Sequence, residues 1–310
     1  MKISIMKKIN LIIALTVIVG GSIFSQQDAM YTHYAFNTLA VNPAYAGSRG
    51  TTTITGLHRS QWVGFDGAPT TQTLTLHSPV FHNSLGMGLS VVNDKIGPTN
   101  MTGIYADLAY RIKLTSNIRL GLGVKGGGNI FQGSLNGLQT KTPDQQLSSV
   151  SGTFLPNFGV GAYLSHTNWY VGFSAPKLLQ NSITANTNGT VGAEQLHYFA
   201  IAGFATKLSR TVVLKPTGFL KVTEAAPIEG DITAMFIFNR KLELGAMYRT
   251  GDAVGALIGF NFNSQLRLGY SFDWSMANTT GTYNAGSHEV MLRYDIFTII
   301  KDNIDSPRYF

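Results

Sequence analysis

The sequence predicts an all-β protein, a transmembrane antiparallel β-barrel of about 14 strands with an N-terminal periplasmic or plug segment. Beyond residue 50, stretches of about ten residues alternate between apolar side chains and glycine or polar ones, with turns between them. The composition agrees, because only 13% of residues are charged against about 25% in ordinary soluble domains. The 34 glycines and the mean hydropathy of only +0.08 also argue against a helical membrane protein.

The first 25 residues have the pattern of a secretory signal peptide. Three lysines precede an apolar run from Leu11 to Gly20, and the small residue Ser25 offers a cleavage point before Gln26. The apolar run is about ten residues, which is too short to cross a bilayer as a helix. We therefore predict export, with residues 1–25 removed. The absence of cysteine excludes a lipid-anchored N-terminus, a disulfide framework and thiolate metal sites.

The formal charge of +7 overstates the basic character of the mature chain. Without the three lysines of the signal region, 20 basic residues stand against 16 acidic ones, a net charge of +4. No run of Lys or Arg suggests a nucleic-acid partner.

The alternating stretches predict one face toward lipid and one toward a polar lumen. Between Leu266 and Trp274, for example, every second residue is apolar, and the residues between them are arginine, glycine, serine and aspartate. Several apolar faces end in an aromatic residue, as aromatic girdles at the lipid–water boundary do. A soluble sandwich would not place so apolar a face opposite so polar and glycine-rich a one, so outer-membrane lipid is the predicted surrounding of the outer face. The aromatic ends are at Tyr110, Tyr248, Trp274 and Tyr294.

The barrel is predicted over residues 51–297, followed by a C-terminal tail, 298–310. Except at 251–252, a short link where a long one is due, the connections alternate between short and long, which is typical of short periplasmic turns and longer outside loops. The long ones are predicted near 62–69, 94–100, 132–152, 176–196, 223–229 and 275–285. The strands are predicted near 51–61, 70–78, 84–93, 101–114, 117–131, 153–163, 169–175, 197–205, 211–222, 230–238, 241–250, 253–262, 265–274 and 286–297.

Residues 26–50 do not have the pattern of a strand, since Asn42-Pro43 favours a turn. They are either an ordered periplasmic lead-in or a plug or docking segment inside or beneath the barrel. Aromatic residues would give such a segment rigid contact area, while Asn and Pro would set its path. We predict partner contact through six of these residues, which would equally serve as internal plug contacts. They are Tyr34, Phe36, Asn37, Asn42, Pro43 and Tyr45.

Charges on the lumen-facing phase have two interpretations. They neutralise one another in a partly wet interior, or they hold the N-terminal segment or an inserted peptide. The basic ones are Arg111, Arg119, Lys125, Lys215, Lys221, Arg249, Arg267 and Arg293, and the acidic ones are Asp107, Asp231, Glu243, Asp273 and Glu289.

Several motifs together resemble a known family. They are Tyr34-Ala35-Phe36-Asn37, Asn42-Pro43-Ala44-Tyr45-Ala46-Gly47, His58-Arg59-Ser60-Gln61-Trp62, Gly67-Ala68-Pro69, Leu85-Gly86-Met87-Gly88, Asn93-Asp94-Lys95-Ile96-Gly97, Tyr105, Tyr110, Gly269-Tyr270-Ser271-Phe272-Asp273, His288-Glu289 and Pro307-Arg308-Tyr309-Phe310. With them the chain resembles the PorP/SprF outer-membrane proteins of the type IX secretion system of the Bacteroidetes over essentially its whole mature length.

The resemblance implies a non-enzymatic outer-membrane barrel for protein secretion and cell-surface attachment. Its implied partner is a secreted protein with a C-terminal sorting domain, such as a gliding adhesin. A periplasmic peptidoglycan-binding lipoprotein is a further implied partner of some members.

The sequence supports no active site, and no metal or cofactor is expected. The seven histidines lack metal-ligand spacing, and His288 and Glu289 point to opposite faces of a strand. His82-Asn83-Ser84 is expected to be a solvated turn, so a membrane hydrolase is a remote third possibility. The alternative function is a porin or hydrophobic-ligand transporter, which architecture alone suggests.

Overall fold

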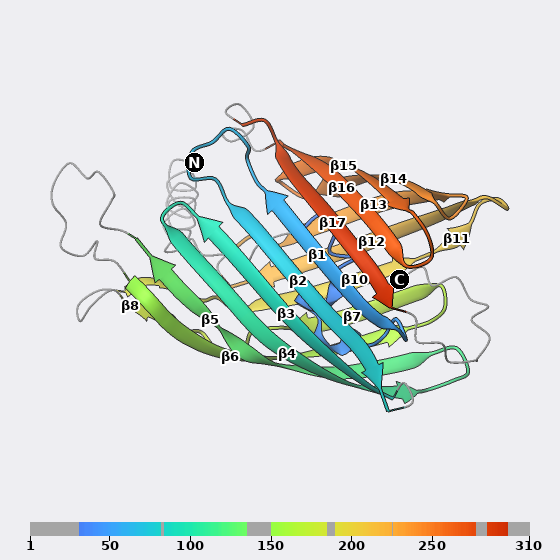
Figure 1. Cartoon of the computed structure of the whole chain (residues 1–310), viewed down its shortest axis with the longest axis horizontal. Helices are drawn as coiled ribbons and strands as arrows, with labels where there is room; N and C mark the ends of the chain where they lie inside the picture. Colours follow the sequence, from blue (N-terminus) through green and yellow to red (C-terminus); the bar gives the residue numbers. More distant parts are fainter. Residues whose placement is uncertain are drawn as a thin grey trace, which may run out of the picture.

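In the computed structural model, the strands form one closed antiparallel barrel (Figure 1). The structure describes residues 31–81, 84–134, 150–184, 190–224, 226–276 and 284–296. The signal region, the tail 298–310 and His82-Asn83 therefore lie outside the described residues. No helix in the described ranges has the length and apolar character needed to cross a membrane.

Fourteen strands make the ring, each paired with the ring strands that precede and follow it, and the pairing of β1 with β17 closes the ring. The short β11 (Thr206–Lys207) extends the hairpin before β12, and β8 (Ser182–Thr184) pairs only with β9 (Thr190–Ala193). The ring consists of β1 (Thr52–Ser60), β2 (Thr70–Val80), β3 (Leu85–Ile96), β4 (Thr99–Lys113), β5 (Arg119–Gly133), β6 (Val150–Ser165), β7 (Trp169–Ala175), β10 (His197–Phe204), β12 (Val212–Thr223), β13 (Glu229–Phe238), β14 (Leu242–Arg249), β15 (Ala253–Asn261), β16 (Leu266–Ser275) and β17 (Ser287–Ile296).

The predicted strand number is confirmed, and two of the predicted long connections differ. Residues 94–100 are not a long loop, because β3 and β4 continue to a two-residue turn at Gly97-Pro98. Gly97 has φ +53, which suits the first position of a tight hairpin turn. The connection 176–196 contains the small β8–β9 hairpin rather than loop alone, and most of 132–152 lies outside the described residues.

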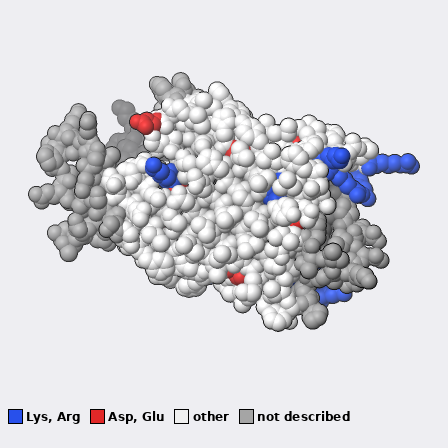
Figure 2. Space-filling view, viewed as in Figure 1, with Lys and Arg blue, Asp and Glu red and all other residues white. Residues whose placement is uncertain are grey.

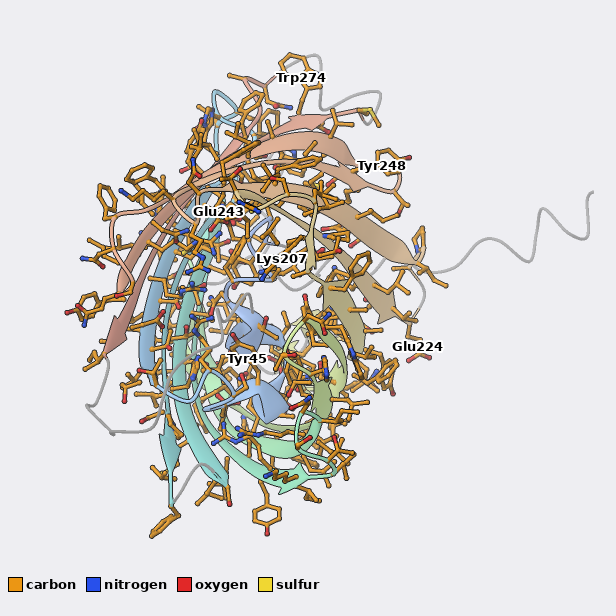
Figure 3. The ribbon with its side chains drawn as sticks, turned by 90° about the vertical axis from the view of Figure 1, so that its right-hand side faces the viewer. Tyr45, Lys207, Glu224, Glu243, Tyr248 and Trp274 are labelled. Carbon is orange, nitrogen blue, oxygen red and sulfur yellow. The ribbon has the colours of Figure 1, made fainter. Side chains whose placement is uncertain are left out.

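The alternation sorts side chains between lipid and lumen as predicted. On β5, Leu122 and Val124 are exposed outward, while Gly121, Gly123 and Lys125 are buried inward. The side of the barrel in Figure 2 carries few charges, and most of its Lys and Arg residues lie toward one end. Tyr248 and Trp274 stand outside the ring of strands in Figure 3. An apolar outer band around a polar interior is the pattern of an outer-membrane barrel.

The lumen is occupied by residues 31–51, which we call the plug. It contains the one-turn helix α2 (Thr38–Val41) and the 3₁₀ turn η1 (Pro43–Tyr45), and it appears as the blue ribbon behind β1 to β3 in Figure 1. Its start contacts Arg59 near the end of β1, where the connections are long. Its end leads into β1 where the connections are short. The plug, rather than a periplasmic lead-in, is therefore the arrangement that residues 31–50 adopt.

Candidate functional site

The middle of the plug is shaped by the Asn42-Pro43-Ala44-Tyr45-Ala46-Gly47 stretch. Pro43 stands at the first position of η1, where its fixed φ is favourable and its missing N–H costs nothing. The Asn42 side chain caps this turn, since its Oδ1 accepts a hydrogen bond from the Ala44 N–H at 2.9 Å. Gly47 ends the motif with φ +66, a conformation that favours glycine. The local sequence thus encodes one compact turn.

Asn42 also fastens this turn to the barrel wall. Its Nδ2 donates to the backbone carbonyls of Ala162 on β6, at 3.1 Å, and of Phe173 on β7, at 3.3 Å. These two residues are partners in the β6–β7 ladder, so one amide bridges two strands. Asn42 is fully buried, which makes each of these bonds hard to replace by water.

Glycines on the inner wall give the plug backbone room to approach. A Cβ at Gly86 would lie 2.0 Å from the Ala46 carbonyl oxygen, and one at Gly123 would lie 2.3 Å from the Ala44 nitrogen. A Cβ at Gly161 would lie 2.2 Å from the Asn42 Oδ1. These glycines come from β3, β5 and β6, so the lumen side of this wall has a shallow seat that matches the turn.

The first residues of the plug are held by an ionic cluster at the long-connection end. The Thr32 N–H, at 2.9 Å, and the His33 N–H, at 2.7 Å, both donate to the Glu289 carboxylate. The Thr32 hydroxyl donates to Asp273 at 2.6 Å. The Arg59 guanidinium contacts both carboxylates, at 2.8 Å to Asp273 and 3.3 Å to Glu289. All five side chains are buried, so this cluster fixes the start of the plug in the barrel.

A second set of contacts holds the last residues of the plug near the short-connection end. Arg49 Nη2 pairs with Asp295 on β17 at 2.9 Å. The Gly47 N–H donates to His77 Nδ1 on β2 at 3.1 Å. Arg111 Nη1 on β4 donates to the Ala46 carbonyl oxygen at 3.3 Å. The plug is thus attached at both ends and at its middle.

The plug's aromatic residues fill the space between these attachments. Tyr45 meets Tyr163 of β6 edge-on, with ring centroids 5.4 Å apart, and it lies inside the ring of strands in Figure 3. Tyr34 packs on Phe219 of β12 at 4.7 Å. Burial raises the pKa of the Tyr34 phenol, which belongs to the plug, to about 12, so the group stays neutral. Phe36 lies beneath the Arg267 guanidinium, with 3.6 Å from Cζ to the ring centroid.

The six residues predicted for partner contact all belong to this plug and are buried in the lumen. Their described contacts are with the barrel or within the plug, as the alternative interpretation allowed. Contact with a partner stays a prediction. Sequence reasoning passed over Thr32, His33 and Arg49, which carry polar attachments of the plug. Only their nearness to the motif would have indicated them.

The lumen charges follow both of the interpretations that the sequence left open. Some pair with one another, as Lys125 does with Asp107 at 3.0 Å and Arg249 with Asp231 at 2.9 Å. Others hold the plug, as Glu289 does. Arg119 differs from its prediction, because it stands exposed at the first residue of β5 and not in the lumen.

A cavity of about 140 Å³ lies beside the plug in the long-connection half of the lumen. Plug residues Tyr31, Ala40 and Val41 form one side. The inner faces of β3, β4 and β5 form another, and the chain from β7 to β10 completes the lining. Among the described residues, no group of three or more His, Cys, Asp or Glu side chains is placed to hold a metal ion.

A closed barrel of 14 antiparallel strands with an apolar outer band, carrying an N-terminal plug, defines the class of outer-membrane β-barrel proteins. The family profile of the type IX secretion system membrane protein PorP/SprF matches residues 23–294, most of the chain. The protein belongs to this family. A comparison with curated protein sequences finds no match.

Solved outer-membrane barrels are similar to this chain at low identity. The Acinetobacter baumannii outer membrane protein Omp33 is 10% identical, with a TM-score of 0.48 over 79% of this chain and 98% of its own. The CymD monoaromatic hydrocarbon channel is 8% identical, with a TM-score of 0.49 over 84% and 93%. The KdgM porin is 10% identical, with a TM-score of 0.39 over 79% and 99%. At these TM-scores the likenesses carry no argument about function.

Proposed function

We propose that the protein is a non-enzymatic outer-membrane barrel of the type IX secretion system. It binds an exported surface protein, or its C-terminal sorting domain, and supports that protein's secretion or attachment to the cell surface. The observation that carries the proposal is the family match over residues 23–294. The plug supports it too, because the lumen is fitted around a segment of the protein's own chain instead of being lined for free diffusion.

A periplasmic partner belongs to the same proposal. By the usual orientation of such barrels, short connections face the periplasm. Around these connections stand exposed cations, and among the described residues this rim carries no exposed Asp or Glu. Such a rim favours an acidic partner surface, and a peptidoglycan-binding lipoprotein is the kind of partner we propose. The exposed cations are Lys113, Arg119, Lys207, Arg210, Arg240 and Lys241.

Purification from native outer membranes in mild detergent, with mass spectrometry of everything that stays bound, tests this function. We expect a large surface protein held through its C-terminal domain, together with a periplasmic lipoprotein. The binding of this lipoprotein should be weakened by Arg240→Glu and by Lys241→Glu. The control is an unrelated barrel from the same membrane, purified in the same way. Repeated recovery of an isolated barrel would refute the proposal.

The alternative, an open porin or ligand transporter, makes a different prediction. Steady single-channel conductance in a planar bilayer would support it. The plug opposes an open path, since it occupies the lumen and is attached at three levels. We therefore expect no steady conductance from the wild-type barrel.

A further inference from the structure

We propose that the cavity beside the plug binds a single aromatic ring, and that this ring is a Phe, Tyr or Trp side chain of the exported protein. The assignment of the ring to the exported protein rests on the proposed function. Binding of an aromatic ring by the cavity depends only on the chemistry of the cavity and is tested separately.

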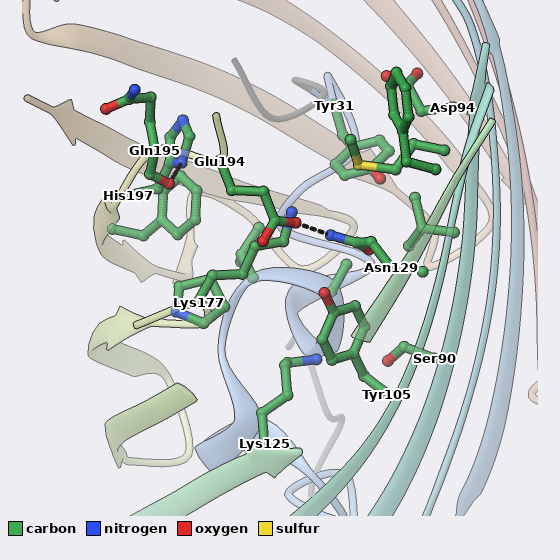
Figure 4. A pocket seen from close by; sticks show the side chains of 18 of the residues that line it. Tyr31, Ser90, Asp94, Tyr105, Lys125, Asn129, Lys177, Glu194, Gln195 and His197 are labelled. Carbon is green, nitrogen blue, oxygen red and sulfur yellow. Dashed lines mark hydrogen bonds between the residues drawn. The ribbon is translucent and has the colours of Figure 1, made fainter. Parts of the chain in front are cut away.

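The lining of the cavity is rich in aromatic and other apolar groups. Tyr31 comes from the plug, Tyr105 from β4, Phe131 from β5 and Phe199 from β10. Met101 adds a polarisable thioether, which packs well against ring edges. Figure 4 shows Tyr31 and Tyr105 on neighbouring sides of the space. An incoming ring would meet ring faces and edges that come from separate elements, an arrangement in which aromatic pairs gain stability beyond area burial.

Polar groups of the lining already have partners within the protein. Glu194 accepts hydrogen bonds from Asn129, Asn157 and Asn181, and the Asn129 contact is drawn in Figure 4. Lys125 pairs with Asp107. A strongly polar ligand would therefore lose its hydrogen bonds to water and find few new partners in the cavity. An apolar ring has no such hydrogen bonds to lose.

Lys125 nevertheless gives the cavity a preference among apolar groups. Its Nζ lies 5.3 Å from the centroid of the Tyr105 ring. A cation already placed against one ring would also be attracted to the face of a second ring beside it. An aliphatic chain of equal volume would gain burial but not this attraction.

The size of the cavity sets the size of the ligand. Its volume of about 140 Å³ is close to the roughly 150 Å³ of an apolar protein cavity that holds one benzene molecule. One ring fits, and a folded domain does not. The ligand is thus a small aromatic compound or one side chain on an extended segment.

The position of the cavity favours a side chain of the exported protein as the source. The strand residues that line it, such as Ser90 to Ile96 on β3 and Thr99 to Tyr105 on β4, belong to the long-connection halves of their strands. This end faces the cell exterior in the usual orientation, where the exported protein is retained. Contact with Val41 and Tyr31 would also tie occupancy to the plug.

The test measures binding of small probes to the full-length barrel in detergent by titration calorimetry. The probes are N-acetyl-tryptophanamide, p-cresol as a free aromatic, and N-acetyl-alaninamide as the aliphatic control. Val92→Phe and Met101→Trp each place a ring into the cavity from its own wall. Val91→Phe is the matched control, because the neighbouring side chain belongs to the lipid-facing phase of the same strand.

We expect both aromatic probes to bind at one site in the wild type and in Val91→Phe, at least tenfold more weakly in both filling variants, and the alaninamide not to bind. Equal aromatic binding in the filling variants, or none in the wild type, would overturn the ring site. Co-purification of the exported protein distinguishes ring binding by the cavity from the exported protein as the source of the ring. If Val92→Phe blocks the probes but leaves co-purification intact, the ring is a free ligand and the source we propose is wrong. If no exported protein co-purifies even with the wild type, the proposed function fails while the ring site stands.

Discussion

Replacing Gly123 by alanine should loosen the plug, because its Cβ has no space. The added carbon would lie 2.3 Å from the Ala44 nitrogen and 2.5 Å from its Cα, whereas ordinary contacts begin at 3.4 Å. Both neighbours are backbone atoms, so the turn must retreat by about 1 Å to restore normal packing. Such a shift would stretch both Asn42 bonds to the wall, now 3.1 and 3.3 Å, beyond hydrogen-bonding distance.

The expected cost is about 3 kcal/mol. Overpacking costs about 1–3 kcal/mol, and each lost hydrogen bond about 1 kcal/mol. At about 1.4 kcal/mol per tenfold change, the released plug should be roughly a hundredfold more populated. The assay exploits the absence of cysteine from the chain. Thr38→Cys introduces one thiol at a buried plug position, and its rate of maleimide labelling reports how often the plug is released.

We expect Gly123→Ala to raise this labelling rate about a hundredfold, in line with that estimate. Gly126→Ala is the matched control, since it lies on the same strand and its added Cβ meets nothing within 4 Å. Equal labelling rates in the two variants would show that the plug does not depend on its close approach to Gly123 on the inner wall.

Three further predictions concern the plug and the membrane face. Asn42→Ala should raise labelling of the same thiol about tenfold or more, because three buried hydrogen bonds disappear; an unchanged rate would contradict the role of the amide. Arg59→Met should destabilise the barrel by about 3–5 kcal/mol in urea unfolding, since two buried carboxylates lose their cation. A cost below 1 kcal/mol would mean that water already solvates this cluster. Val124→Arg should lower the free energy of unfolding of the bilayer-reconstituted barrel by about 2–4 kcal/mol. Leu114→Arg, at a short connection, should lower it little. Equal effects of the two substitutions would mean that β5 does not face lipid.

Most of the fold was predictable because the side chains of each strand alternate between a lipid-facing and a lumen-facing side, and this alternation is visible in the sequence of that strand alone. The alternation from Leu266 to Trp274 is local, and it remained valid strand after strand. The tight turn at Gly97-Pro98 was missed for a physical reason. Asp94 and Asn100 look like loop residues, but in the barrel they belong to the paired ends of β3 and β4, where polar side chains are tolerated at the mouth.

The site was less predictable, because its contacts are not local. The Asn42-Pro43 turn was evident, and so were the lumen charges. That the turn would lie against Gly86, Gly123 and Gly161 was not evident, since glycine shows where space exists but not what fills it. The cavity depends on side chains from six separate elements, and no spacing in the sequence relates them.

The threading of the plug has a consequence for assembly. Its last residues are bonded to β17, through Arg49 to Asp295 and Thr51 to the Ile296 carbonyl, and β17 is also the strand that pairs with β1. The earliest and the latest parts of the described chain therefore meet along one seam. The contacts of β17 with the plug and with β1 join residues more than 220 positions apart in the sequence, so their loop-closure entropy is large. Because residues 31–51 occupy the lumen of the closed barrel, we expect the wall to close around the plug during assembly, with the β1–β17 pairing formed last.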